Sequence, residues 1–282
     1  MNHRTFAAVL VWWLRRLGPW VVGGTIYLIV VAVVVVRYSL AAMRLTSEGA
    51  VAEGFVLGLL MAFRNRAAYD RWWEGRRLWG QLVNDMRNLA WKVRSYLPAD
   101  AVAASRLPAA MIGFAEALKY HLRGGAALQK IRGFEKDAET PAHVPSYLAG
   151  LVLAQLAAWG AEGRLDTAAS LALDVHARSF LDVCGGCERI RNTGISSSYK
   201  NLIRLGLLFN LIVAPWMVIP NLSWWGVPAL WFLLVPVFGV EIVDSVVEEP
   251  FGEDPDDLDL DRFCLTIDQS VTAALGKRSA AD

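Results

Sequence analysis

An acidic run near the C-terminal end of the chain has the composition of a cation site. It reads EEPFGEDPDDLDLD over residues 248–261. Calcium prefers about six to eight oxygen ligands, mostly carboxylates and main-chain carbonyls, so this density of acidic residues suits a hard cation. The order of the residues excludes an EF-hand, because the D-x-D-x-D-G pattern and its final Glu are absent. The alternative is a solvated loop in which Asp257 or Asp259 caps a helix over residues 260–274.

The cysteines and histidines do not form a catalytic or metal-binding motif. Cys184 and Cys187 make one CxxC, but no second pair completes a zinc site, so two buried reduced thiols are favoured over a redox dithiol. Cys264 is interpreted as a core residue. The four histidines lack the H-E-x-x-H spacing of a zinc enzyme and are interpreted as surface or core residues: His3, His121, His143 and His176. Walker loops, nucleophile elbows and dinucleotide fingerprints are also missing, so the sequence predicts a protein that is not an enzyme.

A stripe of large apolar side chains begins the segment FVLGLLMAFRNRAAYDRWWE. Phe55, Leu59 and Phe63 recur every four residues and therefore share one slowly drifting face of a helix. Two interpretations are open for this face. It lines a narrow pore at the centre of a ring of identical subunits, or it is part of the core of a single chain.

The composition indicates a membrane protein. Of the 282 residues, 55% are hydrophobic, which exceeds the roughly 45–50% that is typical of soluble domains. The 12 tryptophans suit the interfacial belts of membrane proteins. The formal net charge is only +1, from 28 basic and 27 acidic residues, so bulk electrostatics give no case for a nucleic-acid partner.

Four apolar segments have the character of membrane-crossing helices: residues 20–36, 51–63, 205–220 and 225–240. The second segment is too short to face lipid alone, so we expect it to be shielded by other protein and to continue as a helix beyond the membrane. The arginines after it and near the N-terminus place both on the cytosolic side by the positive-inside rule.

The expected organisation has five parts: an interfacial helix over residues 1–19, a membrane hairpin over 20–63, a mainly helical cytosolic region over 64–204, a second membrane hairpin over 205–247, and an acidic segment with a C-terminal helix over 248–282.

Two local features are predicted inside the cytosolic region. Ser146 is expected to cap a helix over residues 147–159. The pair Gly185–Gly186 is expected to break a helix.

Three motifs in this order resemble the bestrophin family, in its bacterial branch. They read FRNRAAYDRWWEGRRLWGQLVNDMRNLAW, CERIRNTGI and EEPFGEDPDDLDLDRFC, and they are distributed over most of the chain. The resemblance implies an all-α membrane protein with four transmembrane helices per subunit, a helical cytosolic region and a homopentamer around one central pore. It also implies a multi-pass location in the inner (plasma) membrane with both termini in the cytosol.

The resemblance assigns two constrictions of the pore. Bestrophins narrow at an apolar neck on the second membrane helix, and the shared motifs place Phe55, Leu59 and Phe63 there. A second constriction, the cytosolic aperture, lies at the apolar residue of an N-T-P-I-P element in the family, which places it at Ile195 here. Both prolines of that element are missing from this chain, so a more pliable loop is expected.

The resemblance also bears on the acidic run. Calcium-gated bestrophins of animals hold the ion in a clasp, and Asp254 and Asp257 fall on its carboxylate positions while Glu249 falls on a main-chain carbonyl position. Bacterial members keep an acidic run here without established calcium gating. A channel that requires no cofactor and a channel that binds calcium in this loop therefore both stay open.

The resemblance implies a channel for small monovalent ions, either chloride and other anions or monovalent cations. Conduction through an uncharged neck requires the apolar ring to widen or to admit a partly hydrated ion, and closure excludes water, which is a hydrophobic gate. The expected partners are further copies of the chain, monovalent ions and membrane lipid. The alternative is a membrane structural or sensor protein of the same fold without ion flux.

Overall fold

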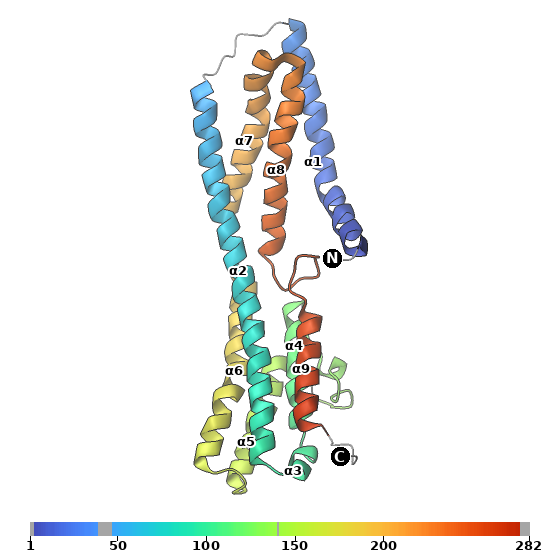
Figure 1. Cartoon of the computed structure of the whole chain (residues 1–282), viewed down its shortest axis with the longest axis vertical. Coiled ribbons are helices and arrows are strands. Elements are labelled where there is room, and N and C mark those ends of the chain that lie inside the picture. Colours follow the sequence, from blue (N-terminus) through green and yellow to red (C-terminus); the bar gives the residue numbers. More distant parts are fainter. Residues whose placement is uncertain (1–2, 39–46, 140, 277–282) are drawn as a thin grey trace. The chain divides into compact units, whose positions relative to one another are not determined.

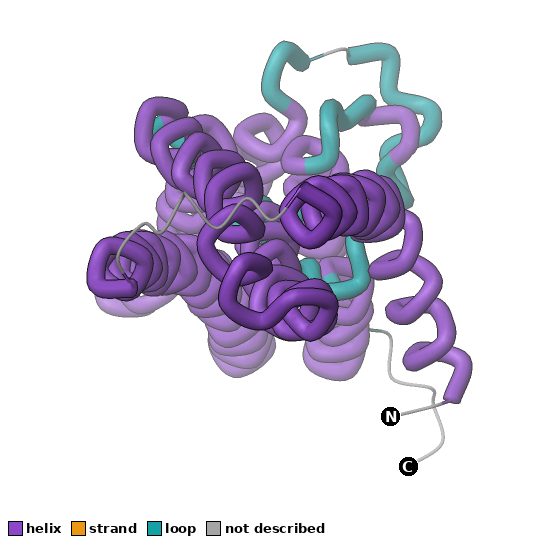
Figure 2. The backbone as a smooth tube through the Cα atoms, turned by 90° about the horizontal axis from the view of Figure 1, so that it is seen from above, coloured by secondary structure: helices purple, strands orange, loops and turns teal. Residues whose placement is uncertain are grey.

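The computed structural model describes residues 3–38, 47–139 and 141–276, which form helices and loops and contain no strand (Figure 2). The expected all-α class is confirmed for these residues. Two short 3-10 helices, η1 (Leu128–Lys130) and η2 (Ser223–Trp225), lie between longer elements. The α-helices in chain order (Figure 1) are α1 (His3–Tyr38), α2 (Ser47–Tyr96), α3 (Ala99–Ala103), α4 (Leu107–Leu122), α5 (Val144–Ala161), α6 (Thr167–Asn192), α7 (Ser197–Leu222), α8 (Gly226–Val247) and α9 (Leu260–Leu275).

The chain forms two compact units that share one long helix. The first unit contains α1, α2 up to Arg71, α7, η2 and α8. The second unit contains α2 from Trp72 onward, α3 to α6 and α9. Helix α2 runs through both units as 50 residues, so the prediction that the second apolar segment continues as a helix is confirmed.

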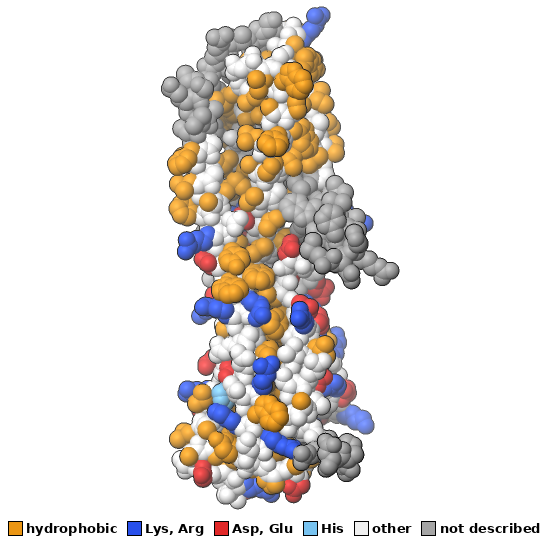
Figure 3. Space-filling view, viewed as in Figure 1, with side chains coloured by type: hydrophobic (Ala, Val, Ile, Leu, Met, Phe, Trp, Pro, Cys, Tyr) orange, Lys and Arg blue, Asp and Glu red, His pale blue; other side chains and the backbone are white. Residues whose placement is uncertain are grey.

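The first unit is held by two small apolar clusters. Helix α1 packs against α7 and α8 (Figure 1) around buried side chains such as Leu28, Ile219 and Leu230. The Tyr27 hydroxyl donates to the Ile212 carbonyl at 2.8 Å, and the Trp216 indole N–H donates to Tyr27 at 3.0 Å. The face of this unit seen in Figure 3 is largely hydrophobic, as expected for a surface that meets lipid or further protein.

Three described stretches are long and apolar enough to cross a membrane: Val21–Tyr38 in α1, Val144–Ala161 in α5, and Ser197–Val247, which covers α7 and α8. The expected segment at residues 51–63 is not among them, because Arg64 and Arg66 follow it directly in α2. Helix α5 qualifies by composition alone, since its side chains Leu148 and Val152 are buried in the core of the second unit.

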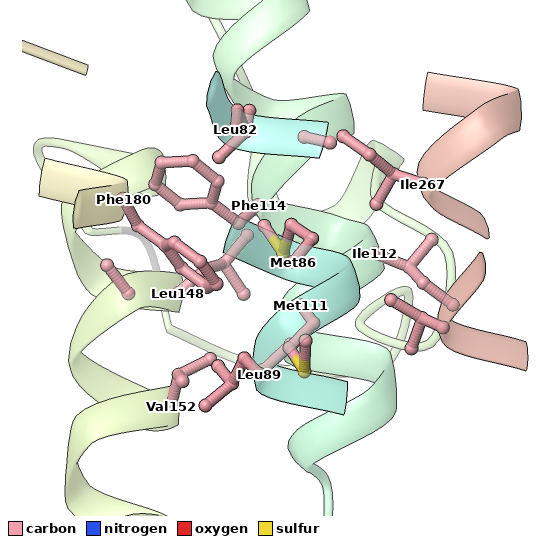
Figure 4. Packing of buried hydrophobic residues seen from close by; sticks show 14 of the residues in the cluster. Leu82, Met86, Leu89, Met111, Ile112, Phe114, Leu148, Val152, Phe180 and Ile267 are labelled. Atoms are coloured by element: carbon pink, nitrogen blue, oxygen red, sulfur yellow. The ribbon is translucent and has the colours of Figure 1, made fainter. Parts of the chain in front are cut away.

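The second unit has one continuous hydrophobic core. Figure 4 shows side chains from five helices meeting in it: Leu82, Met86 and Leu89 of α2, Met111, Ile112 and Phe114 of α4, Leu148 and Val152 of α5, Phe180 of α6, and Ile267 of α9. Phe114 and Phe180 pack with ring centroids 5.2 Å apart, which suits the offset geometry that aromatic pairs prefer. This core is thus completed within a single chain.

Helix boundaries in the second unit confirm one local prediction and overturn two. The Asp259 carboxylate accepts from the Arg262 N–H at 2.9 Å, so Asp259 caps α9 as predicted. The prediction for Ser146 is wrong, because His143 is the cap of α5 and its Nδ1 accepts from the Ser146 N–H at 3.1 Å. The predicted break at Gly185–Gly186 is also wrong. Helix α6 continues, and Gly186 allows close approach to Leu78, since a Cβ at Gly186 would lie 2.9 Å from that side chain.

Candidate functional site

The three predicted neck residues lie on an exposed face of α2. The side chains of Phe55, Leu59 and Phe63 are 71%, 45% and 59% exposed, respectively. They therefore do not belong to the core of a single chain, which was one of the two interpretations of the stripe. An exposed row of large apolar side chains on a helix requires lipid or further protein around it.

The opposite face of the same segment holds α2 in place. Leu57 and Met61 are buried against Ile203 and Leu207 of α7. At about 100° per residue, Leu57 and Met61 point about 180° away from the middle of the exposed row. The Tyr199 hydroxyl adds a hydrogen bond of 2.9 Å to the Leu60 carbonyl. Packing against α7 thus fixes the rotation of α2 about its axis, and with it the direction of the three exposed side chains.

A buried ionic cluster lies directly after the exposed row. Arg64 is on the buried stripe of α2 and forms an ion pair with Glu241 of α8, which also pairs with Arg204 of α7 at 3.3 Å. Arg64 is therefore shielded from solvent. The two ion pairs of Glu241, with Arg64 and Arg204, cross-link three helices at the end of the apolar segment, where a charge left without a partner would be costly.

The predicted aperture residue sits in the short loop between α6 and α7. Ile195 is half-buried, and its N–H donates to the Glu248 carboxylate at 3.0 Å. Lys200 of α7 forms an ion pair of 3.0 Å with the same carboxylate oxygen. A Cβ on Gly194 would lie 3.3 Å from that oxygen, so the Glu248 carboxylate packs closely against the backbone of the loop.

Glu248 is the residue that the sequence prediction missed. Its side chain is buried, and its main-chain carbonyl accepts from Arg71 Nε of α2 at 3.1 Å. One residue at the end of α8 thereby contacts the 194–196 loop, α7 and α2. The loop lacks the prolines of the family element, but this buried carboxylate restrains it instead. Glu248 lies 53 residues from Ile195, so no local pattern signals the contact.

Part of the predicted calcium ligand set converges on Gly252. A Cβ at Gly252 would lie 2.5 Å from the Asp257 Oδ2 atom and 3.8 Å from the Glu249 carbonyl oxygen. The absence of a side chain at position 252 thus leaves room for a carboxylate and a carbonyl beside each other, which fits an oxygen-rich cation site. Asp254, the third predicted ligand, belongs to the first unit.

The three cysteines are free thiols, as predicted. Cys184 and Cys187 are buried in α6, and burial raises the pKa of Cys184 to about 12. Burial likewise raises the pKa of Cys264 to about 12. Because the thiolate is the reactive form, the raised pKa values disfavour reaction of these side chains at neutral pH, as expected for buried structural thiols.

Comparison with known proteins decides the family. Residues 2–273 match the family described as "Bacterial/Fungal Bestrophin protein". The chain belongs to the bestrophin family. A voltage-dependent anion channel-forming protein of Nostoc sp. is 32% identical over 235 residues, covering 79% of this chain and 76% of the relative. A protein of the same description from Mesorhizobium japonicum is 31% identical over 269 residues, covering 93% and 86%.

Solved structures support the bestrophin fold. A mutant of a bacterial bestrophin homologue from Klebsiella pneumoniae has a TM-score of 0.83 at 22% identity, covering 91% of this chain and 98% of that chain. Together with the apolar helices, family membership makes this chain a membrane protein. Bestrophins are ion channels and not enzymes, which confirms the expectation drawn from the missing catalytic motifs.

Proposed function

We propose that this bestrophin forms a homopentameric anion channel in the inner membrane, with four transmembrane helices per subunit, cytosolic termini, and a neck built from Phe55, Leu59 and Phe63. The observation that carries the proposal is the exposed apolar face of α2. The opposite face of this helix packs against α7 and cannot cover it. In a ring of subunits the exposed faces of α2 meet one another around the central axis. Surrounding lipid covers the remaining apolar surface.

The neck supplies no charge and no replacement for the water around an ion. The energy barrier that the neck presents to an ion therefore depends on whether the ring is wide enough to stay filled with water. Aromatic ring edges carry a partial positive charge, so Phe55 and Phe63 favour anions weakly if their edges face the axis. The anion assignment is supported mainly by the Nostoc and Mesorhizobium relatives, whose names describe anion channels.

Ile195 is proposed to form the second constriction, and Glu248 is proposed to set its position. The carboxylate that accepts from the Ile195 N–H also pairs with Lys200, and the same residue contacts Arg71 through its carbonyl. A shift at the end of α8 would therefore move the aperture loop together with α2 and α7. Glu248 acts on ions only through this loop and is a positioning residue.

Calcium is proposed as a ligand of the acidic loop, with oxygens from Asp254, Asp257 and the Glu249 carbonyl. Glu249 directly follows Glu248 in the chain, so an ion held by its carbonyl would bear on the residue that holds the aperture loop. The room beside Gly252 supports this proposal. Calcium binding to the purified protein is expected to weaken in the D257N variant and to be unaffected in E249Q, which keeps the carbonyl.

The experiment that tests the function is a planar-bilayer recording of the purified full chain in asymmetric potassium chloride. The anion-channel proposal predicts a reversal potential close to the chloride equilibrium potential. A reversal potential close to that of potassium would contradict anion selectivity and support a monovalent-cation channel. Absence of current from correctly assembled protein would support the structural or sensor alternative.

A further inference from the structure

Three side chains with metal-ligand chemistry meet in the second unit, and none of them belongs to the predicted neck or aperture. His121 lies in the last turn of α4, His143 caps the start of α5, and Glu188 lies in α6. The Nε2 atoms of the two histidines lie 2.7 Å from the same Glu188 oxygen and 3.3 Å from each other. All three residues are half-buried, so the cluster is enclosed by protein but open to water.

We propose that His121, His143 and Glu188 bind one divalent transition-metal ion, with zinc as the principal ion. Two imidazoles and one carboxylate form a ligand set that zinc accepts in proteins, with water in the fourth position. Imidazole suits zinc, copper and nickel, whereas calcium and magnesium prefer ligand sets made only of oxygen. The site is therefore distinct from the acidic loop in its chemistry as well as in its residues.

The distances fit an ion of this size. Tetrahedral zinc with bonds of about 2.0–2.1 Å holds neighbouring ligand atoms about 3.3 Å apart. The two imidazole nitrogens already have a separation of 3.3 Å. The carboxylate oxygen lies closer, at 2.7 Å from each nitrogen, which is the distance of a hydrogen bond through a proton. Replacing those protons by an ion requires the carboxylate to retreat by about half an ångström.

In the ion-free protein the three ligand atoms lie within 4.8 Å of one another, and one Glu188 oxygen is at hydrogen-bond distance from both imidazole nitrogens. The carboxylate therefore faces both nitrogen ligands before any ion binds. The arrangement gathers one negative charge and two nitrogen ligands from three helices, with separations of 67 and 45 residues along the chain.

Metal binding competes with the cap of α5. His143 Nδ1 accepts from the Ser146 N–H, so in the ion-free protein the neutral ring carries its proton on Nε2. An ion can take Nε2 only after this proton has moved to Nδ1, which removes the acceptor from the Ser146 N–H. The site is therefore expected to bind zinc less tightly than a site in which both rings already have the metal-binding tautomer.

The test uses the full chain in detergent, purified with a tag that contains no histidine, and treated with chelator before titration. Isothermal titration calorimetry with zinc chloride is expected to give one ion per chain, and cobalt chloride is expected to give the visible absorption of a tetrahedral ion. The H121A, H143N and E188Q variants are each expected to weaken zinc binding by more than about tenfold. Asparagine keeps a cap acceptor at position 143 while removing the imidazole.

The matched control is H176A. His176 is also a half-buried histidine beside a carboxylate, 2.8 Å from Asp85, but it lies outside the cluster. Zinc should raise the unfolding temperature of the wild-type protein and of H176A, and it should leave that of H143N unchanged. The proposal is overturned if the wild type binds no stoichiometric zinc. It is equally overturned if H143N and E188Q bind as tightly as the wild type, or if H176A loses the ion.

Discussion

The two halves of α2 use the same helical geometry for opposite purposes. From Trp72 onward one face of the helix carries fully buried apolar side chains, such as Leu82 and Met86, in a core to which the other α-helices of the second unit contribute. Before Arg71 the apolar side chains lie on both sides of the helix, and those at the predicted neck are exposed. Packing inside the chain explains the first pattern and leaves the second without partners.

This difference shows how a membrane channel divides its stability between the subunit and the assembly. The second unit forms one large apolar core within a single chain. The described residues of the first unit form two small clusters and leave a hydrophobic surface that needs lipid and further subunits (Figure 3). Exposed apolar side chains are therefore expected to meet lipid or further subunits, and buried ones are the places where mutations unfold the protein.

The sharpest contrast comes from one substitution made in each half of α2. Leu82→Ala is expected to lower the free energy of unfolding by about 2–5 kcal/mol, because Leu82 is fully buried and leaves a cavity. Leu59→Ala removes the same atoms from an exposed position and should cost no more than about 0.5 kcal/mol within a subunit. Thermal and denaturant unfolding in detergent, followed by circular dichroism, measures both. Equal losses would mean that Leu59 is a core residue.

Glu248→Gln tests the contact that joins the aperture loop to α7. The amide oxygen can still accept from the Ile195 N–H, but the ion pair with Lys200 is lost, so we expect a loss of about 1–3 kcal/mol together with an altered current. Glu249→Gln changes the same charge at an exposed neighbouring position and serves as the control. If E248Q matches E249Q in its free energy of unfolding and in its bilayer current, Glu248 does not position the aperture loop.

Replacing Phe55, Leu59 and Phe63 together by Ala is expected to leave the assembly intact and to raise the single-channel conductance several-fold. The physical reason is that a wider ring of small side chains stays wet and no longer excludes ions. The control replaces Phe232 and Leu233, exposed apolar residues of α8, by Ala. Unchanged conductance in a well-assembled triple mutant, or an equal rise in the control, would count against the neck.

A smaller effect is expected from acid on the second unit. The hydrogen bond from Lys119 lowers the pKa of Asp261 below its usual value, and Arg123 adds to this. The pairing therefore contributes stability above the unfolded-state pKa of about 3.9, and this contribution is lost as the pH falls through the lower folded-state pKa. Asp261 is exposed, so solvent screening keeps the contribution small. In D261N the free energy of unfolding should depend less on pH below about pH 4 than in the wild type. An unchanged pH dependence would contradict the pairing.

Features encoded over a few residues could be predicted from the sequence. The continuous helix α2, the apolar part of α1 and the Asp259 cap follow from local composition and spacing. The apolar stripe predicted that Phe55, Leu59 and Phe63 share one face of α2 but not what surrounds that face, because periodicity alone does not distinguish a core from a pore.

Contacts between distant parts of the chain could not be predicted. Glu248 meets Ile195 only because α8 ends beside the loop that precedes α7. His121 and His143, which were interpreted from the sequence as surface or core residues, meet at Glu188. The cap of α5 was missed because His143, and not the more usual serine at position 146, supplies the acceptor. In each case the tertiary fold, and not the local pattern, brings the groups together.

The most direct test of the central claim is the accessibility of a cysteine placed at Leu59. The native cysteines are expected to contribute little background modification, because burial raises their pKa and disfavours reaction at neutral pH. A charged water-soluble thiol reagent applied during a bilayer recording is expected to modify L59C and to reduce the current within the recording. The same reagent should leave the current of F232C unchanged. Modification of L59C without any change in current, or no modification while the channel is open, would contradict a pore lined by this face of α2.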